Sequence, residues 1–208
     1  MSIACPGCGR EYDVTLFQFG RTLHCTCGRR VGLEKRVGPR LPEADTRPRF
    51  LVDEMLEHLA RWLRVMGYDA AGAGGLADEA LVRRALAEDR MLLTRDRELP
   101  RNWRVRNVVV VEDKGPWDQL RALVRRLGLD PEAAPFTRCS RCNEPLVEVG
   151  RRELQELESE SDPAAPTVPP GVLEREERFR RCPGCGRVYW EGGHTRRMLE
   201  RLRSLRSR

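Results

Sequence analysis

The 208-residue sequence has few aromatic residues, 6% of the chain, and is almost without lysine, because only Lys35 and Lys114 among its 38 basic residues are lysines. A core with few aromatic rings must be built from aliphatic side chains, and Leu, Val and Ala dominate residues 50–130. Long apolar runs are lacking too, and none approaches the roughly 20 residues that a membrane-spanning helix needs. We therefore expect an aliphatic core and no membrane association.

A secretion signal is also lacking, since Met1 to Cys5 do not begin a basic segment that leads into an apolar one. We therefore expect a cytoplasmic protein. In that reducing compartment, grouped cysteines serve more often as metal ligands than as disulfides.

The eight cysteines fall into two quartets, each made of two closely spaced pairs. The first quartet is Cys5, Cys8, Cys25 and Cys27, and the second is Cys139, Cys142, Cys182 and Cys185. Two such pairs complete a tetrahedral four-thiolate site, which predicts two structural zinc ions. A closed site leaves no position for a substrate, so we expect each zinc to stabilise a small module that grips nucleic acid or protein. His24, beside Cys25, is interpreted as a surface histidine.

Basic side chains are concentrated at the two ends of the chain, although the formal net charge is only +6. Residues 1–49 and 194–208 are rich in arginine, whereas residues 50–130 are balanced in charge. A coding bias would explain why arginine replaces lysine but not this distribution. The pattern favours a catalytic body flanked by segments that bind a polyanion.

From Phe50 onward, short apolar segments alternate with helical patterns. Strands are predicted at Phe50–Val52, Met91–Thr94 and 108–111, and apolar residues recur at helical spacing between them. Strands that alternate with helices of this length imply right-handed crossovers and a parallel sheet. The predicted fold class is therefore α/β, with a mainly parallel sheet flanked by helices and two small zinc modules.

Acidic residues stand where this pattern changes. Asp53 and Asp96 follow two predicted strands, and Asp78 opens the helix between them. Ligands of open α/β sheets bind outside the carboxyl ends of the strands, so we expect these side chains to converge. Carboxylates suit Mg²⁺ or Mn²⁺, and a hydrated ion of this kind can orient water for attack on a phosphodiester. Helix capping is the alternative for each aspartate, and the further acids that could complete the set are Glu79, Glu98 and Asp113.

Several separated motifs resemble a known family. They include Phe-Leu-Val-Asp-Glu-Met-Leu from residue 50, Thr-Arg-Asp-Arg-Glu-Leu from residue 94, Arg-Cys-Ser-Arg-Cys-Asn from residue 138 and Trp-Glu-Gly-Gly-His from residue 190. Together they resemble the PIN-like ribonuclease domain first recognised at the C-terminus of Mut-7, over residues 50 to about 202. The resemblance implies a PIN-like nuclease fold with a fused zinc ribbon and a metal-dependent ribonuclease activity.

Carried over by motif, Asp53 matches the first-strand carboxylate of that family and Asp96 the carboxylate of its Thr-Arg-Asp motif. Asp78 matches the acid that opens the middle helix, and this match is the loosest. The resemblance does not extend to residues 1–49, so the role of the first zinc module is not inherited from it.

Four residues are candidates for substrate binding. Arg61 and Arg64 lie one helical turn apart after Asp53, and Arg95 precedes Asp96, so each could contact the scissile phosphate. The alternative for these arginines is a surface position or an internal ion pair. His194, in a Gly-Gly-His turn before the basic C-terminal segment, is either a helix cap or a phosphate contact.

The predicted organisation has five parts: an N-terminal zinc ribbon (1–33), a proline-containing linker (34–49), a PIN-like nuclease domain (50–130), a C-terminal zinc ribbon (131–193) with a mobile insertion at about 153–170, and a basic helix (194–208). The first functional hypothesis is an endoribonuclease that uses Mg²⁺ or Mn²⁺, with RNA, tRNA or the ribosome as candidate partners. The second is a non-catalytic adaptor that binds RNA or ribosomes. A nuclease acting on DNA is a third, and only the resemblance favours RNA.

Overall fold

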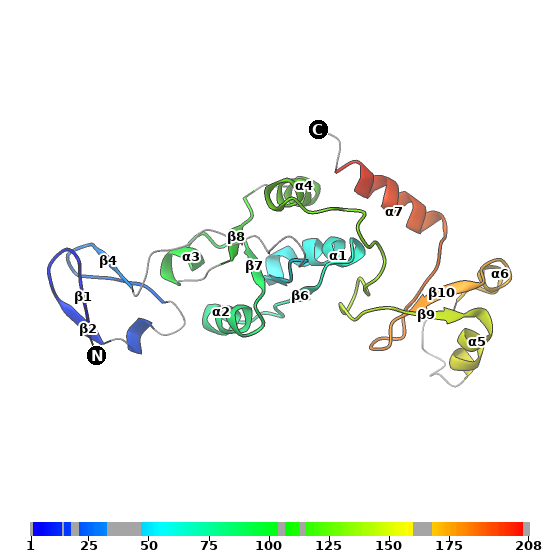
Figure 1. Ribbon diagram of the computed structural model, residues 1–208, viewed down its shortest axis with the longest axis horizontal. Helices are drawn as coiled ribbons and strands as arrows, with labels where there is room; N and C mark the ends of the chain where they lie inside the picture. Colours follow the sequence, from blue (N-terminus) through cyan, green and yellow to red (C-terminus); the bar gives the residue numbers. More distant parts are fainter. Residues whose placement is uncertain are drawn as a thin grey trace. The chain divides into compact units, whose positions relative to one another are not determined.

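The computed structural model describes residues 2–13, 15–17, 21–32, 47–103, 107–112, 115–159 and 168–205. It divides into two compact units, one made of Met1–Glu57 and Ala71–Gly115 and the other of His58–Ala70 and Pro116–Arg208. Figure 1 labels helices and strands of both units. The two units alternate along the chain, so the domain boundaries expected from the sequence remain a prediction. Most of the predicted linker, residues 34–46, lies outside the described residues.

The first unit contains a four-stranded sheet with the strand order β6-β5-β7-β8. Its strands are β5 (Phe50–Val52), β6 (Ala70–Gly72, apart from Ala70, which belongs to the second unit), β7 (Met91–Thr94) and β8 (Val108–Val110). β5 pairs with β7, and β7 with β8, in parallel, with Val52 opposite Leu93 and Thr94 opposite Val110. Every residue of β5 and β7 is buried, which explains their uniformly apolar sequences. The predicted α/β fold with a parallel sheet is confirmed.

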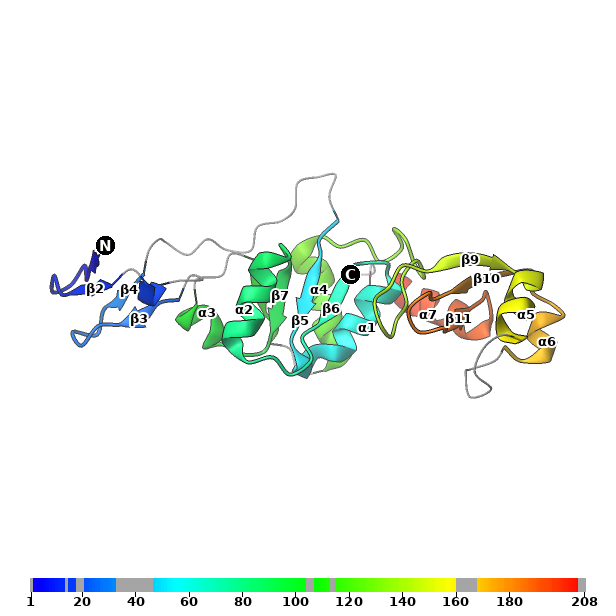
Figure 2. The same cartoon turned by 90° about the horizontal axis from the view of Figure 1, so that it is seen from below.

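Two helices and a short 3₁₀ turn (η2, Glu54–Leu56) complete this part of the first unit (Figure 2). α2 (Asp78–Ala87) packs against β7, and α3 (Leu99–Asn102) follows the same strand. Their apolar side chains share one core with the sheet. That core consists of Leu51, Ala71, Ala73, Leu81, Val82, Ala85, Leu92 and Leu99, with Trp103 and Val108 packed against it.

The N-terminal module of the first unit is built from two short antiparallel pairs. β1 (Ser2–Ala4) pairs with β2 (Glu11–Asp13), and β3 (Leu23–His24) pairs with β4 (Arg30–Val31). Its small core contains Phe17 and Val31 together with Cys5 and Cys25. Because so little apolar surface is buried, a module of this size needs a metal or disulfides to be stable.

The second unit contains α1 (Glu57–Val65, apart from its first residue), α4 (Pro116–Leu127) and a three-stranded antiparallel sheet. The order of that sheet is β11-β10-β9, formed by Val188–Tyr189, Arg178–Arg181 and Val147–Gly150. α5 (Arg151–Ser159) and α6 (Pro170–Leu173) accompany it, and Val149, Leu154, Val168 and Phe179 form the local core.

The expected mobile insertion at about 153–170 begins as an ordered helix. α5 runs to Ser159, and Leu154 is fully buried in the core of the three-stranded sheet, which explains why this acidic segment is helical. Residues 160–167 lie outside the described part of the chain, so the expectation is not tested there.

The C-terminal helix α7 (Gly193–Arg203) has one buried stripe, with Leu202 and the following Leu205 both buried. The Arg201 guanidinium lies 4.5 Å from the ring centroid of Trp117, and the Arg203 Nε donates to Glu132 Oε1 at 2.8 Å. At least two arginines of this basic helix are therefore engaged within the unit. No helix among the described residues is long and apolar enough to cross a membrane.

Candidate acidic site and metal centres

The first cysteine quartet has the geometry of a zinc site. Cys5 Sγ lies 3.6 Å from Cys27 Sγ, and Cys8 Sγ lies 3.4 Å from Cys25 Sγ. All four sulfurs lie within 4.8 Å of one another. Tetrahedral zinc with bonds of about 2.3 Å would place its sulfurs about 3.8 Å apart, which is close to these two distances, so the four thiols are grouped as a zinc site requires.

Two groups favour the thiolate form that zinc requires. The backbone N–H of Cys27 and the hydroxyl of Tyr12 lower the pKa of the Cys25 thiol to about 5. The backbone N–H of Gly7 also faces Cys5 Sγ, at 3.4 Å. His24 is exposed and does not belong to the quartet, in agreement with its interpretation as a surface histidine.

The second quartet is equally compact. Cys139 Sγ lies 3.5 Å from Cys185 Sγ, and Cys142 Sγ lies 3.3 Å from Cys182 Sγ. The Tyr189 hydroxyl lies 3.2 Å from Cys139 Sγ and accepts the backbone N–H of Ser140 at 3.0 Å. Both quartets could therefore hold zinc, as the sequence predicts.

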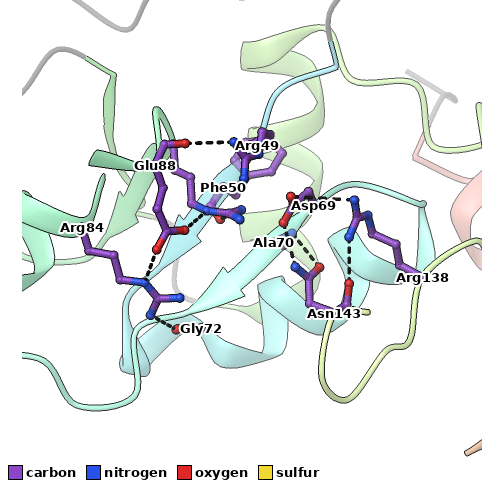
Figure 3. Close-up of polar contacts among 10 residues, drawn as sticks. Arg49, Phe50, Asp69, Ala70, Gly72, Arg84, Glu88, Arg138 and Asn143 are labelled. Atoms are coloured by element: carbon purple, nitrogen blue, oxygen red, sulfur yellow. Dashed lines mark hydrogen bonds and ion pairs between the residues drawn. The ribbon is translucent and has the colours of Figure 1, made fainter. Parts of the chain in front are cut away.

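The knuckle of the second quartet is held by polar contacts to the segment that precedes β6 (Figure 3). Asn143 has a left-handed backbone with φ of 73°, and its Oδ1 accepts the backbone N–H of Ala70 at 2.9 Å. Its Nδ2 donates to Asp69 Oδ1 at 2.7 Å, while Arg138 donates to the Asn143 carbonyl at 2.8 Å. A short amide side chain tolerates this backbone conformation, which explains why Asn follows Cys142.

Arg64 belongs to this same structural region. Its side chain is 3% exposed, and its guanidinium donates to the carbonyls of Ala70 at 2.7 Å and Arg141 at 2.9 Å. A third contact runs to the carbonyl of Ser140 at 3.3 Å. The interpretation of Arg64 as a phosphate ligand does not agree with this burial, so we remove it from the substrate-binding candidates.

The acidic site begins at the carboxyl ends of β5 and β7. Asp53 follows β5, and its backbone N–H donates to the Leu93 carbonyl at 2.9 Å, which continues the parallel pairing. Its Oδ2 accepts the Thr94 hydroxyl at 2.7 Å. Thr94 Oγ1 in turn accepts the backbone N–H of Asp96 at 3.0 Å. One fully buried threonine thus connects the two strand-end aspartates.

Asp78, the first residue of α2, faces the same electrostatic environment. Partial burial raises the pKa of its carboxyl, and the negative charges of Asp96 and Asp53 raise it further. Mutual repulsion of this kind is what a bound cation would relieve. The carboxyl of Asp78 is therefore close enough to Asp53 and Asp96 for their charges to affect it.

The aspartate oxygens are less tightly grouped than the cysteine sulfurs. In the described part of the chain, the side chains whose ligand atoms all lie within 4.8 Å of one another are the two quartets. At least one pair of aspartates is therefore farther apart. Mg²⁺ retains several waters and is usually held by only one or two carboxylates directly, so it does not require direct contact with all three aspartates.

The three reserve acids differ in their surroundings. Glu79 is exposed and pairs with Arg83 at 2.8 Å, and Glu98 pairs with Arg101. Asp113 lies outside the described residues. Asp78 is therefore the third candidate carboxylate, since the charges of Asp96 and Asp53 contribute to its raised pKa after burial.

Two residues near the site were not singled out in the sequence. Thr94 is one, and its role depends on where a single hydroxyl lies. Glu54 is the other. Its carboxylate lies beside Gly75, in the loop that leads to α2, where a Cβ added to the glycine would come within 3.2 Å of Glu54 Oε2. The sequence signal for each is its place in a motif with an aspartate, since Glu54 follows Asp53 directly and Thr94 stands two residues before Asp96.

The remaining substrate-binding candidates are exposed. Arg95 lies on the turn between Thr94 and Asp96 in the first unit. Arg61 on α1 and His194 in the first turn of α7 belong to the second unit. Trp190 lines a pocket of about 860 Å³ in that unit, together with Phe136, Arg178 and Arg196.

A polar network at the other end of the sheet fixes α2 to β5 (Figure 3). Glu88, just after α2, accepts Arg84 Nε at 2.8 Å and Arg90 Nε at 2.5 Å. Buried Arg90 also donates to the Phe50 carbonyl at 3.2 Å. The hydrogen bond from Arg84 and then that from Arg90 lower the pKa of Glu88. The network thus anchors the elements whose opposite ends present Asp53 and Asp78.

Comparison with known protein families identifies the family of this chain. Neither the curated proteins nor the solved structures contain a match. The model of the Mut7-C RNAse domain family matches residues 48–202, a range that includes the acidic site and the second quartet but not the N-terminal module. The chain therefore belongs to the Mut7-C RNAse domain family.

Proposed function

We propose that this protein is a metal-dependent endoribonuclease whose active site is formed by Asp53, Asp78 and Asp96. The observation that carries the proposal is the pair of hydrogen bonds by which buried Thr94 connects Asp53 and Asp96. Asp78 completes the set, because burial raises the pKa of its carboxyl and the negative charges of Asp96 and Asp53 raise it further. Membership of a ribonuclease domain family supplies the substrate class. The aspartates alone do not distinguish RNA from DNA.

The three carboxylates would hold Mg²⁺ or Mn²⁺. When bound, such an ion polarises the phosphate and activates a water for attack on phosphorus. Thr94 donates to Asp53 Oδ2 at 2.7 Å and so fixes the orientation of that carboxylate. The backbone N–H of Glu98 does the same for Asp96, at 2.7 Å. Exposed Arg95 would contact the phosphate oxygens of the substrate.

The zinc modules would serve RNA binding rather than chemistry. Closed four-thiolate sites offer no position for substrate, so zinc at either quartet is structural. Arg61 on α1 and His194 on α7 are exposed candidates for RNA contacts. The candidate RNA partners include tRNA and the ribosome. Eight cysteines without disulfides favour a reducing compartment, the cytoplasm.

A non-catalytic RNA- or ribosome-binding adaptor is the second candidate. One observation favours it: the aspartate oxygens do not gather as closely as the cysteine sulfurs do in the described residues. A scaffold that kept the fold without the chemistry would have no need of close carboxylates.

A cleavage assay decides between these functions. The full-length, zinc-loaded chain is incubated with end-labelled single-stranded RNA and Mn²⁺ or Mg²⁺, with single-stranded DNA in parallel. Asp53→Asn, Asp78→Asn and Asp96→Asn should each lower the cleavage rate by about 100-fold or more, because each removes a charged ligand. Glu79→Gln, next to Asp78 but paired with Arg83, should cleave like the wild type.

Equal cleavage by wild type and the three aspartate variants would refute the proposed site. The adaptor would be supported if the wild type cleaved nothing but co-sedimented with RNA or ribosomes, and if that binding survived Asp53→Asn and weakened steeply with salt. Zinc content should be unchanged in every variant.

A further inference from the structure

The N-terminal zinc module contacts α3, the short helix that follows the Thr94-Arg95-Asp96 motif. The backbone N–H of Thr22 donates to the Asn102 carbonyl at 2.6 Å. The Thr22 hydroxyl donates to the Arg101 carbonyl at 2.6 Å and lies 3.2 Å from that of Asn102. Helix ends leave carbonyls without partners, and Thr22 satisfies two of those at the end of α3.

Arg21 adds a second contact to the same place. It forms an isolated antiparallel bridge with Trp103, and its guanidinium lies 5.6 Å from the centroid of the indole ring. Trp103 itself packs against the core that contains Leu92 and Leu99. The module is thus joined to α3 by hydrogen bonds and a cation–π contact together.

The other end of α3 is joined to the acidic site. Glu98 is the residue before the helix, and its backbone N–H donates to Asp96 Oδ1 at 2.7 Å. From Asp96 the contacts continue through Thr94 to Asp53. A helix of four residues has no stability by itself, so the position of α3 depends on Leu99, which is buried in the core, and on what holds its two ends.

We infer that Thr22 and Arg21 are positioning residues for the acidic site, and that the N-terminal zinc module holds α3 so that Asp96 keeps its orientation. Neither residue touches the reacting atoms. The module lies outside the range matched by the family model, so this support is not implied by membership of the family. The expected effect of the module on catalysis rests on the proposed function, but its expected effect on the order of α3 does not.

The test uses the full-length chain with the double substitution Arg21→Gln and Thr22→Val. The matched control is Thr15→Val, in the same module, where the hydroxyl donates to Asp13 and not to α3. Backbone hydrogen exchange is measured without Mn²⁺, and the exchange of the Asp96 and Glu98 amides should be about 10-fold faster in the double variant. The control should exchange like the wild type, and zinc content should be the same in all three.

Mn²⁺ titration and single-turnover cleavage give the functional readouts. The double variant should bind Mn²⁺ roughly 10-fold more weakly, at the lower end of the effect of residues that orient metal ligands. Its kcat should fall while its KM for RNA stays within twofold. A module that only grips RNA would instead raise KM and leave kcat, Mn²⁺ affinity and amide exchange unchanged, which would overturn the inference.

Failure of the proposed function would look different. If the wild type bound no Mn²⁺ and cleaved no RNA, the exchange measurement would still decide whether the module holds α3. Unchanged exchange at Asp96 and Glu98 in the double variant would refute the positioning role in either case.

Discussion

Replacing Thr94 by valine tests how the acidic site is held together. Valine has nearly the same shape as threonine, so the substitution removes one hydroxyl from a fully buried position and leaves the packing in place. Two contacts are lost: the donation to Asp53 Oδ2 at 2.7 Å and the acceptance of the Asp96 N–H at 3.0 Å. Both strand-end aspartates should lose orientation at once.

The size of the effect follows from these contacts. A hydrogen bond to a charged group contributes about 1.5–3 kcal/mol, so the free energy of unfolding should fall by about 2 kcal/mol. Residues that orient metal ligands typically change metal affinity by about 10- to 100-fold. That range corresponds to about 1.4–2.8 kcal/mol of binding free energy.

The assay is Mn²⁺ titration calorimetry on the zinc-loaded protein, with urea denaturation of the same samples. Thr94→Ser is the control, because it keeps the hydroxyl and loses only a methyl group. The serine variant should bind Mn²⁺ like the wild type, even if it is somewhat less stable. Wild-type Mn²⁺ affinity in Thr94→Val would show that Thr94 does not orient the aspartates, and the reasoning would fail.

Two further predictions concern stability. Glu88→Gln should lower the free energy of unfolding by about 1 kcal/mol at pH 7, a modest value because the Glu88 side chain is 35% exposed. Since its pKa is lowered in the fold, this contribution is present above the unfolded pKa of about 4.3 and is lost as the pH falls through the folded pKa. Urea denaturation should therefore show the two proteins converging below about pH 4, and a difference that grew on acidification would contradict the assignment. Arg64→Gln should lower the free energy of unfolding by about 2–4 kcal/mol, because it leaves buried carbonyls without their hydrogen-bond donor. Arg61→Gln, at an exposed position, should change it by less than about 0.5 kcal/mol. Equal thermal stability of these two variants would mean that Arg64 is not used as described.

The α/β fold could be predicted because its apolar pattern is local. β5 and β7 are buried along their whole length, so each appears in the sequence as an uninterrupted apolar segment. Parallel strands end at the same edge, which is why Asp53 and Asp96 could be expected together despite their separation in sequence. The two cysteine quartets could be predicted for a similar reason, since ligand spacing is fixed by the geometry of zinc.

The burial of Arg64 could not be predicted from helical spacing. Arg64 lies four residues after Ala60, which is fully buried, whereas Arg61 is exposed. Both arginines lie away from the apolar positions Leu59, Leu63 and Met66, so the sequence pattern does not distinguish them. The packing of α5 also depends on few residues. In this acidic segment one leucine, Leu154, lies fully buried in the core of the three-stranded sheet.

The contacts of Thr94 and Thr22 could not be predicted from the sequence. Both depend on the position of one hydroxyl relative to a segment elsewhere in the fold. Thr22 meets carbonyls 79 and 80 residues away in the chain, and no local pattern specifies such a pairing. These contacts are tertiary, and they became visible only once the strands and α3 were placed.

The account depends most on one divalent ion being held by the three aspartates. The most direct test is an anomalous difference map from crystals of the zinc-loaded protein soaked in Mn²⁺, recorded at a wavelength that distinguishes manganese from zinc. We predict one manganese peak bonded to carboxylate oxygens of Asp53 and Asp96, with Asp78 bound directly or through water, and no such peak in Asp96→Asn. A map of the wild type with zinc at both quartets and no manganese at these aspartates would contradict the account.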